Sequence, residues 1–438
     1  MGQTLRLVDL RRKTFDAQLV NSLVPRAEVD IEAAMAVILP IIAEVSKSSL
    51  AAVTRITLDR DGFDPQPLWV SDEEFDRAEK ALEPALRESI ETAISRVSKV
   101  SQANLPHSTS VSLDDGAEVS QRWVPVDSVG LYVPGGKAVY PSSVVMNVVP
   151  AQVAGVKEMV IATPGQADFG GRPHPTVLAT AALLGVRRVL NLGGPAAIAA
   201  FAFGIQEIGL DPVAMVTGPG NIYVAAAKRA LRGRIGIDSE AGTTEILVIA
   251  DESANARFVA ADLISQAEHD ESAASILVTD SEKLAEMVQR ELELQLAKTS
   301  NRVRAGAALA GQQSAIVLVD DLQAAVLFAN CYATEHLELQ TKVNQQLLKS
   351  ISNAGAVFIG GFSPVSLGDY LAGSNHVLPT GQQAKFGSGL GVHTFLRAQQ
   401  VVNYSETALK QVAALVDGFA RSEGLSAHGD AVKVRFEI

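Results

Sequence analysis

Four short stretches of the 438-residue chain carry most of the side chains that could bind a metal or transfer a proton. In the first, "LISQAEHDESAASILVT", Gln266 and His269 stand three positions apart at the end of a helical pattern. Neighbours at this spacing share one face of a helix, so both side chains can point at one ion or ligand. Because glutamine is an unusual metal ligand, the spacing alone favours a solvated last turn of the helix.

The second stretch, "CYATEHLELQT", places Glu335 beside His336 just before a possible strand. An acid next to an imidazole can divide water activation and proton transfer between them. Taken alone, the pair fits an exposed helix end somewhat better than a catalytic site. Cys331 could attack an aldehyde as a thiolate, but its apolar setting, "VLFANCYA", predicts a buried structural cysteine.

The third and fourth stretches lie towards the C-terminus. "SPVSLGDYLAGSNHVLPTGQQAKF" contains Asp369 and His376, and its length and its Gly, Ser, Asn and Pro content predict a functional loop. "RSEGLSAHGDAV" carries Glu423 and His428 in a segment that reads as an exposed tail. The sequence has no C-x-x-C or H-E-x-x-H motif, so spacing alone does not establish a zinc site.

The elements that must position these residues alternate between strand and helix. The first 110 residues read as helices, with Ser71 as an N-cap before an acidic turn. Short apolar runs then alternate with helical stretches, which predicts parallel strands with crossovers in two α/β units and a cleft between them. The runs are "SVGLYVPGG", "KEMVIATPG", "RRVLNLGG" and "PVAMVTGPGN", then "TEILVIADE", "SAASILVTD", "QSAIVLVDD" and "AGAVFIGG".

Glycine-rich turns follow several of these strands. "VPGGKAVYPSS", "NLGGPAA" and "TGPGNIY" fall at carboxyl ends of strands, where helix N-termini can bind phosphate, so a nucleotide site is plausible. "GPGNIY", however, has Tyr223 where the third glycine of G-x-G-x-x-G belongs. The glycine pattern alone therefore favours ordinary strand–helix turns.

Composition narrows the class of protein. A net charge of −12 without a basic tract argues against nucleic acid as a partner. No signal-peptide core and no window of bilayer character is evident, and Arg6 breaks the myristoylation pattern that Gly2 would begin. A single cysteine fits a reducing compartment. The expectation is a globular, cytoplasmic protein without membrane contact.

Six blocks in order, "GLYVPGG", "TGPGNIYVAAAK", "SQAEHD", "ATEHLEL", "SLGDYLAGSNHVLPT" and "EGLSAHGDAV", resemble the histidinol dehydrogenase family over nearly the whole chain. The resemblance implies a zinc-dependent enzyme that oxidises L-histidinol through L-histidinaldehyde to L-histidine with two NAD⁺, the last step of histidine biosynthesis. It further implies an intertwined homodimer with two Rossmann-like parallel-sheet domains, a helical N-terminal segment and a small helical C-terminal tail domain.

The same resemblance assigns roles to individual residues. Glu335 would activate water and His336 would take the alcohol proton. The remaining roles form three sets: zinc ligands Gln266, His269, Asp369 and His428; substrate contacts Thr244, His376 and Glu423, together with His336 and the four zinc ligands; and NAD contacts Tyr132 and Asn221, with Ala196 at a third cofactor position. Glu423 and His428 would reach the site of the partner subunit.

Two departures from the family pattern occur. In "GGPAA", Ala196 stands where the family usually has glutamine, so it cannot supply that hydrogen bond to the cofactor. In "EAGTTE", Thr244 replaces the serine of the usual "PAGPSE" but keeps a hydroxyl. The expected segments are 1–24, at the N-terminus; 25–127, the helical part of the first α/β domain; 128–240, the NAD-side α/β domain; 241–388, the remainder of the first domain with the zinc and catalytic residues; and 389–438, the tail.

Two other functions are compatible with the pattern. One is an NAD-dependent dehydrogenase of the same fold that acts on another amino alcohol, a sulfonate or a polyol. The other is a metal-stabilised binding protein without turnover. The Glu335–His336 pair argues against the second, because a binding module has no need of a positioned base.

Overall fold

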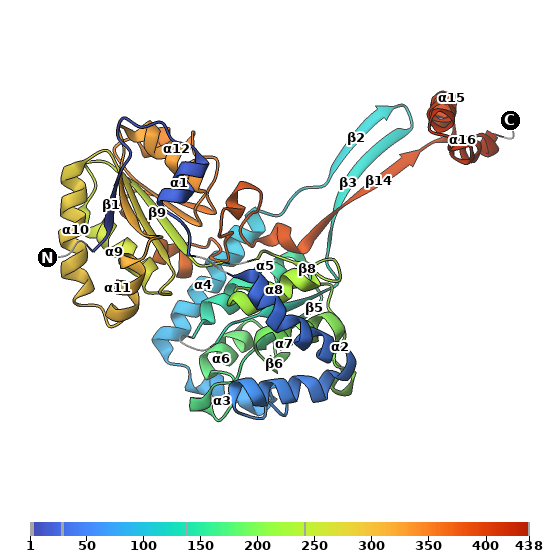
Figure 1. Ribbon diagram of the computed structural model, residues 1–438. Helices are drawn as coiled ribbons and strands as arrows, with labels where there is room; N and C mark the ends of the chain where they lie inside the picture. Colours follow the sequence, from blue (N-terminus) through green and yellow to red (C-terminus); the bar gives the residue numbers. More distant parts are fainter. Residues whose placement is uncertain (1–3, 28–29, 136–138, 241, 437–438) are drawn as a thin grey trace.

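The computed structural model describes residues 4–27, 30–135, 139–240 and 242–436 (Figure 1). Its centre consists of two separate parallel sheets. The smaller sheet has the strand order β6-β5-β4-β7-β8, and every neighbouring pair is parallel. Its elements are β4 (Ser128–Tyr132), α5 (Pro141–Ala154), β5 (Glu158–Thr163), α6 (Pro175–Leu183), β6 (Val189–Asn191), α7 (Gly194–Phe203), β7 (Met215–Thr217), α8 (Ile222–Leu231) and β8 (Gly236–Ile237).

The larger sheet has the order β1-β11-β10-β9-β12-β13 and is also parallel throughout. Its first strand, β1 (Arg6–Asp9), comes from the N-terminal segment, which continues into α1 (Ala17–Leu23). The other elements are β9 (Glu245–Ala250), α9 (Ala256–Ala267), β10 (Ala274–Thr279), α10 (Glu282–Leu296), α11 (Arg302–Ala310), β11 (Ala315–Leu318), α12 (Leu322–Tyr332), β12 (His336–Gln340), α13 (Asn344–Leu348), β13 (Ala356–Ile359) and α14 (Val365–Tyr370). The predicted α/β class with parallel sheets is confirmed.

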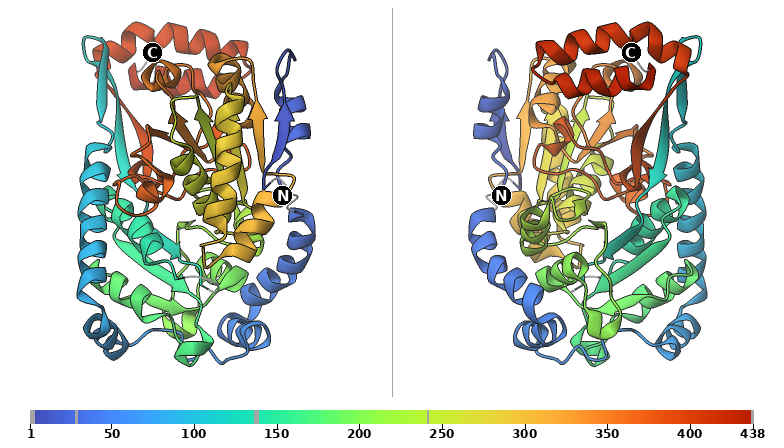
Figure 2. Two further views of the ribbon diagram at one scale, coloured as in Figure 1. Left: turned by 90° about the vertical axis from the view of Figure 1, so that its left-hand side faces the viewer. Right: turned by 90° about the vertical axis from the view of Figure 1, so that its right-hand side faces the viewer.

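Three helices precede the smaller sheet: α2 (Ile31–Asp61), α3 (Asp72–Ala81) and α4 (Pro84–Ala103). Ser71 caps α3 and forms a capping box with Glu74, as the acidic turn predicted. Pro84 at the first position of α4 separates two helices where the sequence suggested one. In side view, α2 and α4 run along opposite flanks of the smaller unit (Figure 2).

The packing of these helices differs from the expected grouping. The helix α2 packs on α7 and α8, α3 on α6, and α4 on α5. Residues 25–127 were expected to accompany residues 241–388, yet these helices cover the smaller sheet, because their apolar faces join its two hydrophobic clusters. Contrary to the sequence expectation, α2 has the length and composition to cross a membrane, a test that buried helices of soluble proteins also pass.

An extension, here called the arm, comprises residues 109–125 and 396–436. Its strands β2 (Thr109–Asp114), β3 (Ala117–Pro125) and β14 (Leu396–Tyr404) form an antiparallel sheet in the order β14-β3-β2. The helices α15 (Glu406–Ser422) and α16 (Ser426–Lys433) follow, and the whole arm projects away from the two sheets (Figure 1). The sequence predicted the helices of this tail but not its antiparallel strands.

Candidate active site

The Glu335–His336 pair lies at the amino edge of the larger sheet, where α12 passes into β12. Both side chains are buried. The Oε2 atom of Glu335 accepts hydrogen bonds from the Thr244 hydroxyl at 2.5 Å and from the Glu245 amide at 2.9 Å. It also lies 3.4 Å from Nδ1 of His336. The start of β9 therefore holds the acid in place beside the imidazole.

The backbone of Glu245 also fixes the orientation of the imidazole. His336 Nδ1 lies 3.1 Å from the Glu245 carbonyl oxygen. Because a carbonyl cannot donate, Nδ1 carries the proton, and in the neutral ring Nε2 holds the lone pair that can act as a base. Burial lowers the pKa of His336, but the adjacent Glu335 carboxylate outweighs burial and raises it to about 9. The surroundings therefore hold the pKa of this base well above the ordinary imidazole value of about 6.5.

Glu335 itself stays ionised. Burial favours its protonated form, but His336 and the hydrogen bonds from Thr244 and Glu245 outweigh burial and lower the pKa of Glu335. The pair can thus present a carboxylate that accepts hydrogen bonds beside an imidazole that exchanges a proton. This is the division of labour that an acid–base site needs.

Thr244 links this pair to the first of the expected metal ligands. Its hydroxyl, which donates to Glu335, accepts a hydrogen bond from the side-chain nitrogen of Gln266. The other amide atom of Gln266, Oε1, is buried and has no hydrogen-bond partner among the residues described. A buried polar atom without a partner is costly, so Oε1 has the environment expected of an atom that binds a ligand.

Asp369 and His376 approach the pair from the loop around α14. His376 Nδ1 lies 3.0 Å from the Asp369 carbonyl oxygen, and its Nε2 lies 3.2 Å from the Ser143 hydroxyl on α5. Burial lowers the pKa of His376. The Asp369 carboxylate contributes to the raised pKa of His336, which shows that the two groups are close enough to interact. The structure therefore brings His336, Asp369 and His376 into one region.

His269 is exposed and lines a cavity of about 490 Å³ between the two α/β units, together with Tyr140 and Tyr370. Sequence reasoning did not identify these two tyrosines. Both are near motifs that the sequence analysis considered. Tyr140 lies in the "VPGGKAVYPSS" turn, and Tyr370 directly follows Asp369. Residues 136–138 of that turn lie outside the described part of the chain.

Glu423 and His428 do not join this region within one chain. Both are exposed in the helical part of the arm, at the end of α15 and in α16, which projects away from the larger sheet (Figure 1). Within the ranges that the structure describes, no three His, Cys, Asp or Glu residues are grouped closely enough to hold a metal ion. One chain thus brings Gln266, His269 and Asp369 to the same part of the fold, but not His428.

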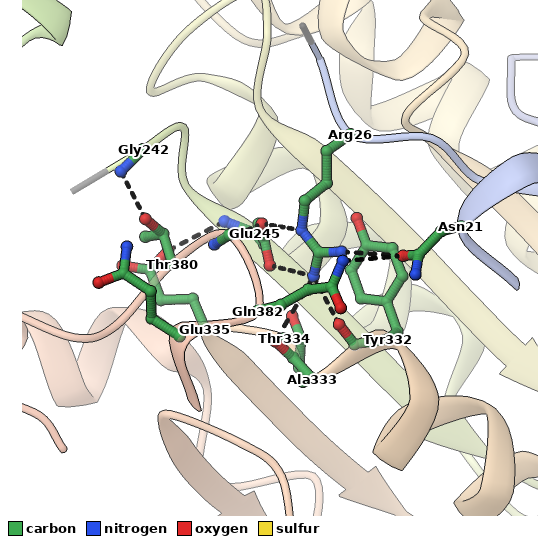
Figure 3. A network of polar contacts seen from close by, with 12 residues as sticks. Asn21, Arg26, Gly242, Glu245, Tyr332, Ala333, Thr334, Glu335, Thr380 and Gln382 are labelled. Carbon is green, nitrogen blue, oxygen red and sulfur yellow. Dashed lines mark hydrogen bonds and ion pairs between the residues drawn. The ribbon is translucent and has the colours of Figure 1, made fainter. Parts of the chain in front are cut away.

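A buried ion pair involves Glu245, whose backbone contacts both Glu335 and His336; Figure 3 shows this ion pair together with Glu335. Arg26, which follows α1, binds both carboxylate oxygens of Glu245 at 2.5 and 3.0 Å, and its guanidinium lies 3.8 Å from the centre of the Tyr332 ring. Gly381 donates its amide to the same carboxylate at 3.1 Å. Sequence reasoning missed Arg26 and Glu245, because a single arginine after a helix carries no signal of burial. Since the Glu245 backbone holds both Glu335 and His336, this ion pair fixes the site.

A second cavity, of about 530 Å³, lies at the carboxyl edge of the smaller sheet. The three expected cofactor residues Tyr132, Ala196 and Asn221 all line it, and so do Gln166 and Asp61, which the sequence did not single out. Gln166 follows the turn after β5. Its position just beyond the carboxyl end of a strand is the signal that could have identified it as a cavity residue.

The turns around this second cavity are held by hydrogen bonds. The Tyr132 hydroxyl accepts a hydrogen bond from the Gly194 amide at 3.1 Å, and Asn221 caps the N-terminus of α8. Gly218 adopts φ +118°, and a Cβ there would lie 2.0 Å from the Tyr132 carbonyl oxygen. Only glycine fits this close approach of two chain segments.

Cys331 does not contribute to either cavity. It is partly buried rather than fully buried, and burial raises the pKa of its thiol. A raised pKa disfavours the thiolate, so the structure agrees with a packing role rather than nucleophilic attack.

The chain matches known proteins along almost its whole length. The family model for histidinol dehydrogenase matches residues 24–436. Histidinol dehydrogenase of Leifsonia xyli subsp. xyli is 55% identical over 433 residues, covering 99% of both chains. That of Mycobacterium tuberculosis (strain H37Rv) is 51% identical over 436 residues, covering 99% of this chain and 98% of the relative. The crystal structure of histidinol dehydrogenase from Elizabethkingia anophelis superposes with a TM-score of 0.94 at 30% identity, covering 100% of this chain and 99% of the other. The chain therefore belongs to the histidinol dehydrogenase family.

Proposed function

We propose that the enzyme oxidises L-histidinol through L-histidinaldehyde to L-histidine, with two NAD⁺ and one zinc ion per subunit, as the last step of histidine biosynthesis. The observation that carries this proposal is the buried Glu335–His336 pair, held by the backbone of Glu245 beside the unpartnered Oε1 of Gln266. An amino alcohol bound there would meet a base, a carboxylate and a metal ligand at one place.

The proposed zinc ligands are Gln266, His269 and Asp369 of one subunit and His428 of the other. The unpartnered Gln266 Oε1 supports this set, because binding an ion would satisfy that atom. Nitrogen and oxygen donors of this kind suit zinc and also accept manganese or cobalt. When bound, the ion would supply a positive charge that binds and orients the substrate.

In the first oxidation, His336 accepts the hydroxyl proton of histidinol at Nε2 while the substrate loses hydride to NAD⁺. Its Nδ1–H group continues to donate to the Glu245 carbonyl throughout, so the ring does not rotate. In the second oxidation, the Glu335 carboxylate takes a proton from water as the water adds to the aldehyde carbon. The hydrate anion left by this proton transfer would pass its hydride to the second NAD⁺ and become the carboxylic acid, and Glu335 would release its proton to solvent.

The remaining substrate contacts are proposed for His376, for the Thr244 hydroxyl and for Glu423 of the partner subunit. Two observations support the first two: His376 is buried with its Nδ1 on the Asp369 carbonyl, and Thr244 bridges Gln266 and Glu335. Both residues are thus attached to the groups that would bind and oxidise the substrate. They would limit the orientations that the bound imidazole and amine can adopt.

The cavity at the carboxyl edge of the smaller sheet is the proposed NAD⁺ site. Tyr132 and Asn221 line it, and the edge of a parallel sheet where helices begin is where dinucleotides bind in this class of fold. Ala196 offers only a methyl group to this cavity. Gln166 lines the same cavity and carries an amide that can donate to the cofactor.

The arm supports the proposed homodimer. Its large apolar side chains Val402, Leu415, Phe419 and Val434 are between 67% and 74% exposed. Apolar surface of this extent on a projecting element favours burial against a second copy of the chain. In such a dimer Glu423 and His428 of each arm would reach the partner's Gln266 and Asp369, which the arm does not reach in its own chain.

The proposal is tested by counting products. Purified enzyme supplied with histidinol and excess NAD⁺ should form two NADH for each histidine, and removal of metal with a chelator should abolish turnover until zinc is restored. A product ratio of one NADH with aldehyde as the end product would contradict the four-electron reaction. Full turnover by protein verified to be free of metal would contradict the zinc site.

A further inference from the structure

Three elements carry the proposed site: α9 supplies Gln266, β12 supplies His336 and α14 supplies Asp369. Each of them also carries a second polar group, one helical turn or two strand residues away from the first. On α14 this is the backbone amide of Val365, four residues before Asp369. On α9 this is Asp262, four residues before Gln266. On β12 it is Glu338, two residues after His336. Residues at these spacings share one face of a helix or strand, so the second groups form a layer directly behind the first.

The groups of this layer bind one another. The side-chain nitrogen of Gln340 donates to Glu338 Oε2 at 2.8 Å and to Asp262 Oδ2 at 3.1 Å. The backbone amide of Val365, the first residue of α14, donates to Glu338 Oε1 at 3.1 Å. Asp262 and Glu338 also share a hydrogen bond between their carboxyl groups. One buried carboxyl group thus connects a helix, a strand and the start of a second helix.

This layer is not explained by the chemistry already described. Glu338 is 1% exposed and Asp262 8% exposed, and no lysine or arginine in the described part of the chain is among the causes that shift the pKa of either group. Burial raises the pKa of Asp262 to about 6 and that of Glu338 to about 8. Two carboxyl groups in contact without a cation are stable when they share a proton. Maintaining such a pair is costly, which implies a specific role.

We propose that Asp262, Glu338 and Gln340 form a positioning cluster that sets α9, β12 and α14 in the register that brings Gln266, His336 and Asp369 together. The inference rests on the proposed metal site. The cluster touches neither substrate nor ion; it acts through Gln266 and Asp369. Its two carboxyl groups share one proton, so that a hydrogen bond replaces the repulsion between them.

The test is the zinc affinity of full-length enzyme that has been stripped of metal, measured by competition with a chromophoric chelator. Glu338→Leu keeps most of the side-chain volume but removes the hydrogen bonds, and zinc affinity should fall about 10–100-fold, as is typical when partners of metal ligands are lost. Glu338→Gln keeps an acceptor for Val365 and a donor for Asp262. It loses only the acceptor for Gln340, which still donates to Asp262, so its affinity should stay within about 3-fold of wild type.

A second pair of variants addresses the same bond without changing either carboxyl group. Val365→Pro removes the amide hydrogen at the first position of α14 and also replaces the buried side chain. Proline is tolerated at this position, and Pro364 already has the extended conformation that a following proline requires. Val365→Ala truncates the side chain but keeps the amide. Zinc affinity should therefore fall in the proline variant and not in the alanine variant.

Gln313→Leu is the control for general destabilisation. Gln313 is a buried amide in the same α/β unit that donates to the Ala273 and Ala308 carbonyls. Its loss should lower the melting temperature without changing zinc affinity. His269→Ala is the control for the site itself and should lose zinc binding.

Three results would overturn the inference. If Glu338→Leu and Val365→Pro bound zinc as tightly as wild type while His269→Ala did not, the metal site would stand and the positioning role would be wrong. If His269→Ala also kept full affinity, the proposed metal site would be wrong, and the positioning role with it. Loss of affinity in Glu338→Gln equal to that in Glu338→Leu would show that charge, not hydrogen bonding, matters.

Discussion

The two parallel sheets are used at opposite edges. The smaller sheet places its cavity at the carboxyl ends of its strands, where backbone turns such as that at Gly218 approach one another closely. The larger sheet places Glu335 and His336 at its amino edge, where buried side chains hold one another. The usual rule for open α/β sheets locates ligands at carboxyl ends, so it describes only the smaller sheet. In the proposed function, the smaller sheet would offer backbone for recognition and the larger sheet titratable groups for chemistry.

The sharpest test of this division is to remove the base from the larger sheet. Glu335→Gln keeps the shape and the hydrogen bonds but lacks the carboxylate. Oxidation of supplied histidinaldehyde should fall on the order of 10²–10⁴-fold, the usual loss for a general base, while histidinol oxidation continues. His336→Asn should show the reverse. Stopped-flow measurement of each half-reaction decides, and aldehyde oxidation at the wild-type rate in Glu335→Gln would require another base.

A second test asks whether one chain supplies all the ligands of the site at the larger sheet. His269→Ala and His428→Ala should each be inactive. Mixed in equal amounts with proven subunit exchange, they should recover about one quarter of wild-type activity, because half of the dimers are hybrids with one intact site of two. The measurement is NADH formation before and after exchange. An absence of recovery would mean that all ligands come from one chain.

The smaller sheet should respond to backbone changes instead. Gly218→Ala forces a Cβ against the Tyr132 carbonyl and should lower the free energy of unfolding by at least about 1–3 kcal/mol and raise the KM for NAD⁺. Gly233→Ala is the matched control, because Gly233 has φ +101° but open space around its Cβ position. Chemical denaturation compares the two. Equal destabilisation would show that strain alone, not the contact with Tyr132, determines the cost.

The pH dependence of histidinol oxidation should reflect the titratable groups at the larger sheet. His336 can accept a proton only when neutral, and Glu335 holds its pKa at about 9, so histidinol oxidation should rise with pH up to that value. The contribution of the Glu335–His336 ion pair to stability has the opposite pH dependence. It is complete below the ordinary pKa of histidine and is lost as the pH rises through the folded-state pKa of His336, about 9. In Glu335→Gln the rise in the histidinol half-reaction should move to lower pH. If the midpoint of this pH profile did not change, Glu335 would not be the group that raises the pKa of His336.

The smallest effect is expected at Ala196. Ala196→Gln adds an amide to the cavity at the smaller sheet, and one added hydrogen bond should lower the KM for NAD⁺ about 2–10-fold with little change in kcat. Steady-state kinetics with varied NAD⁺ measures it. If the KM rises, Gln166 or a neighbour already occupies the space.

The sequence was informative where local patterns decide structure. The eight strand runs form parallel strands, and Ser71 caps a helix as its motif predicted. The strand "HLELQ" is less informative, because alternating polar residues are typical of a strand with one face in solvent. In the fold, α9 and α14 cover that face, so Glu338 and Gln340 are buried. The packing of distant elements on a strand determines which of its residues are buried, and the local sequence pattern does not reveal this packing.

The arm escaped prediction for a related reason. Every residue of β2 is exposed, so neither face of the strand carries an apolar alternation. Its pairing with β3, and the pairing of β3 with β14, come from segments far apart in the chain. The contribution of Arg26 likewise depends on Glu245, more than two hundred positions away. Motif resemblance pointed to the residues that are proposed to act on substrate, whereas the residues that support them depend on tertiary contacts.

The position of β1 at the edge of the larger sheet has a consequence for the order of folding during synthesis. Arg6 pairs with Ala315, so the first strand to leave the ribosome must wait for nearly three quarters of the chain. At ordinary elongation rates that interval is roughly 15–60 s. During this time the smaller sheet, whose strands are contiguous in sequence, can form while the N-terminal strand is still without its neighbour. A nascent-chain protease assay should therefore find residues 6–9 cleavable after the smaller sheet has become protected.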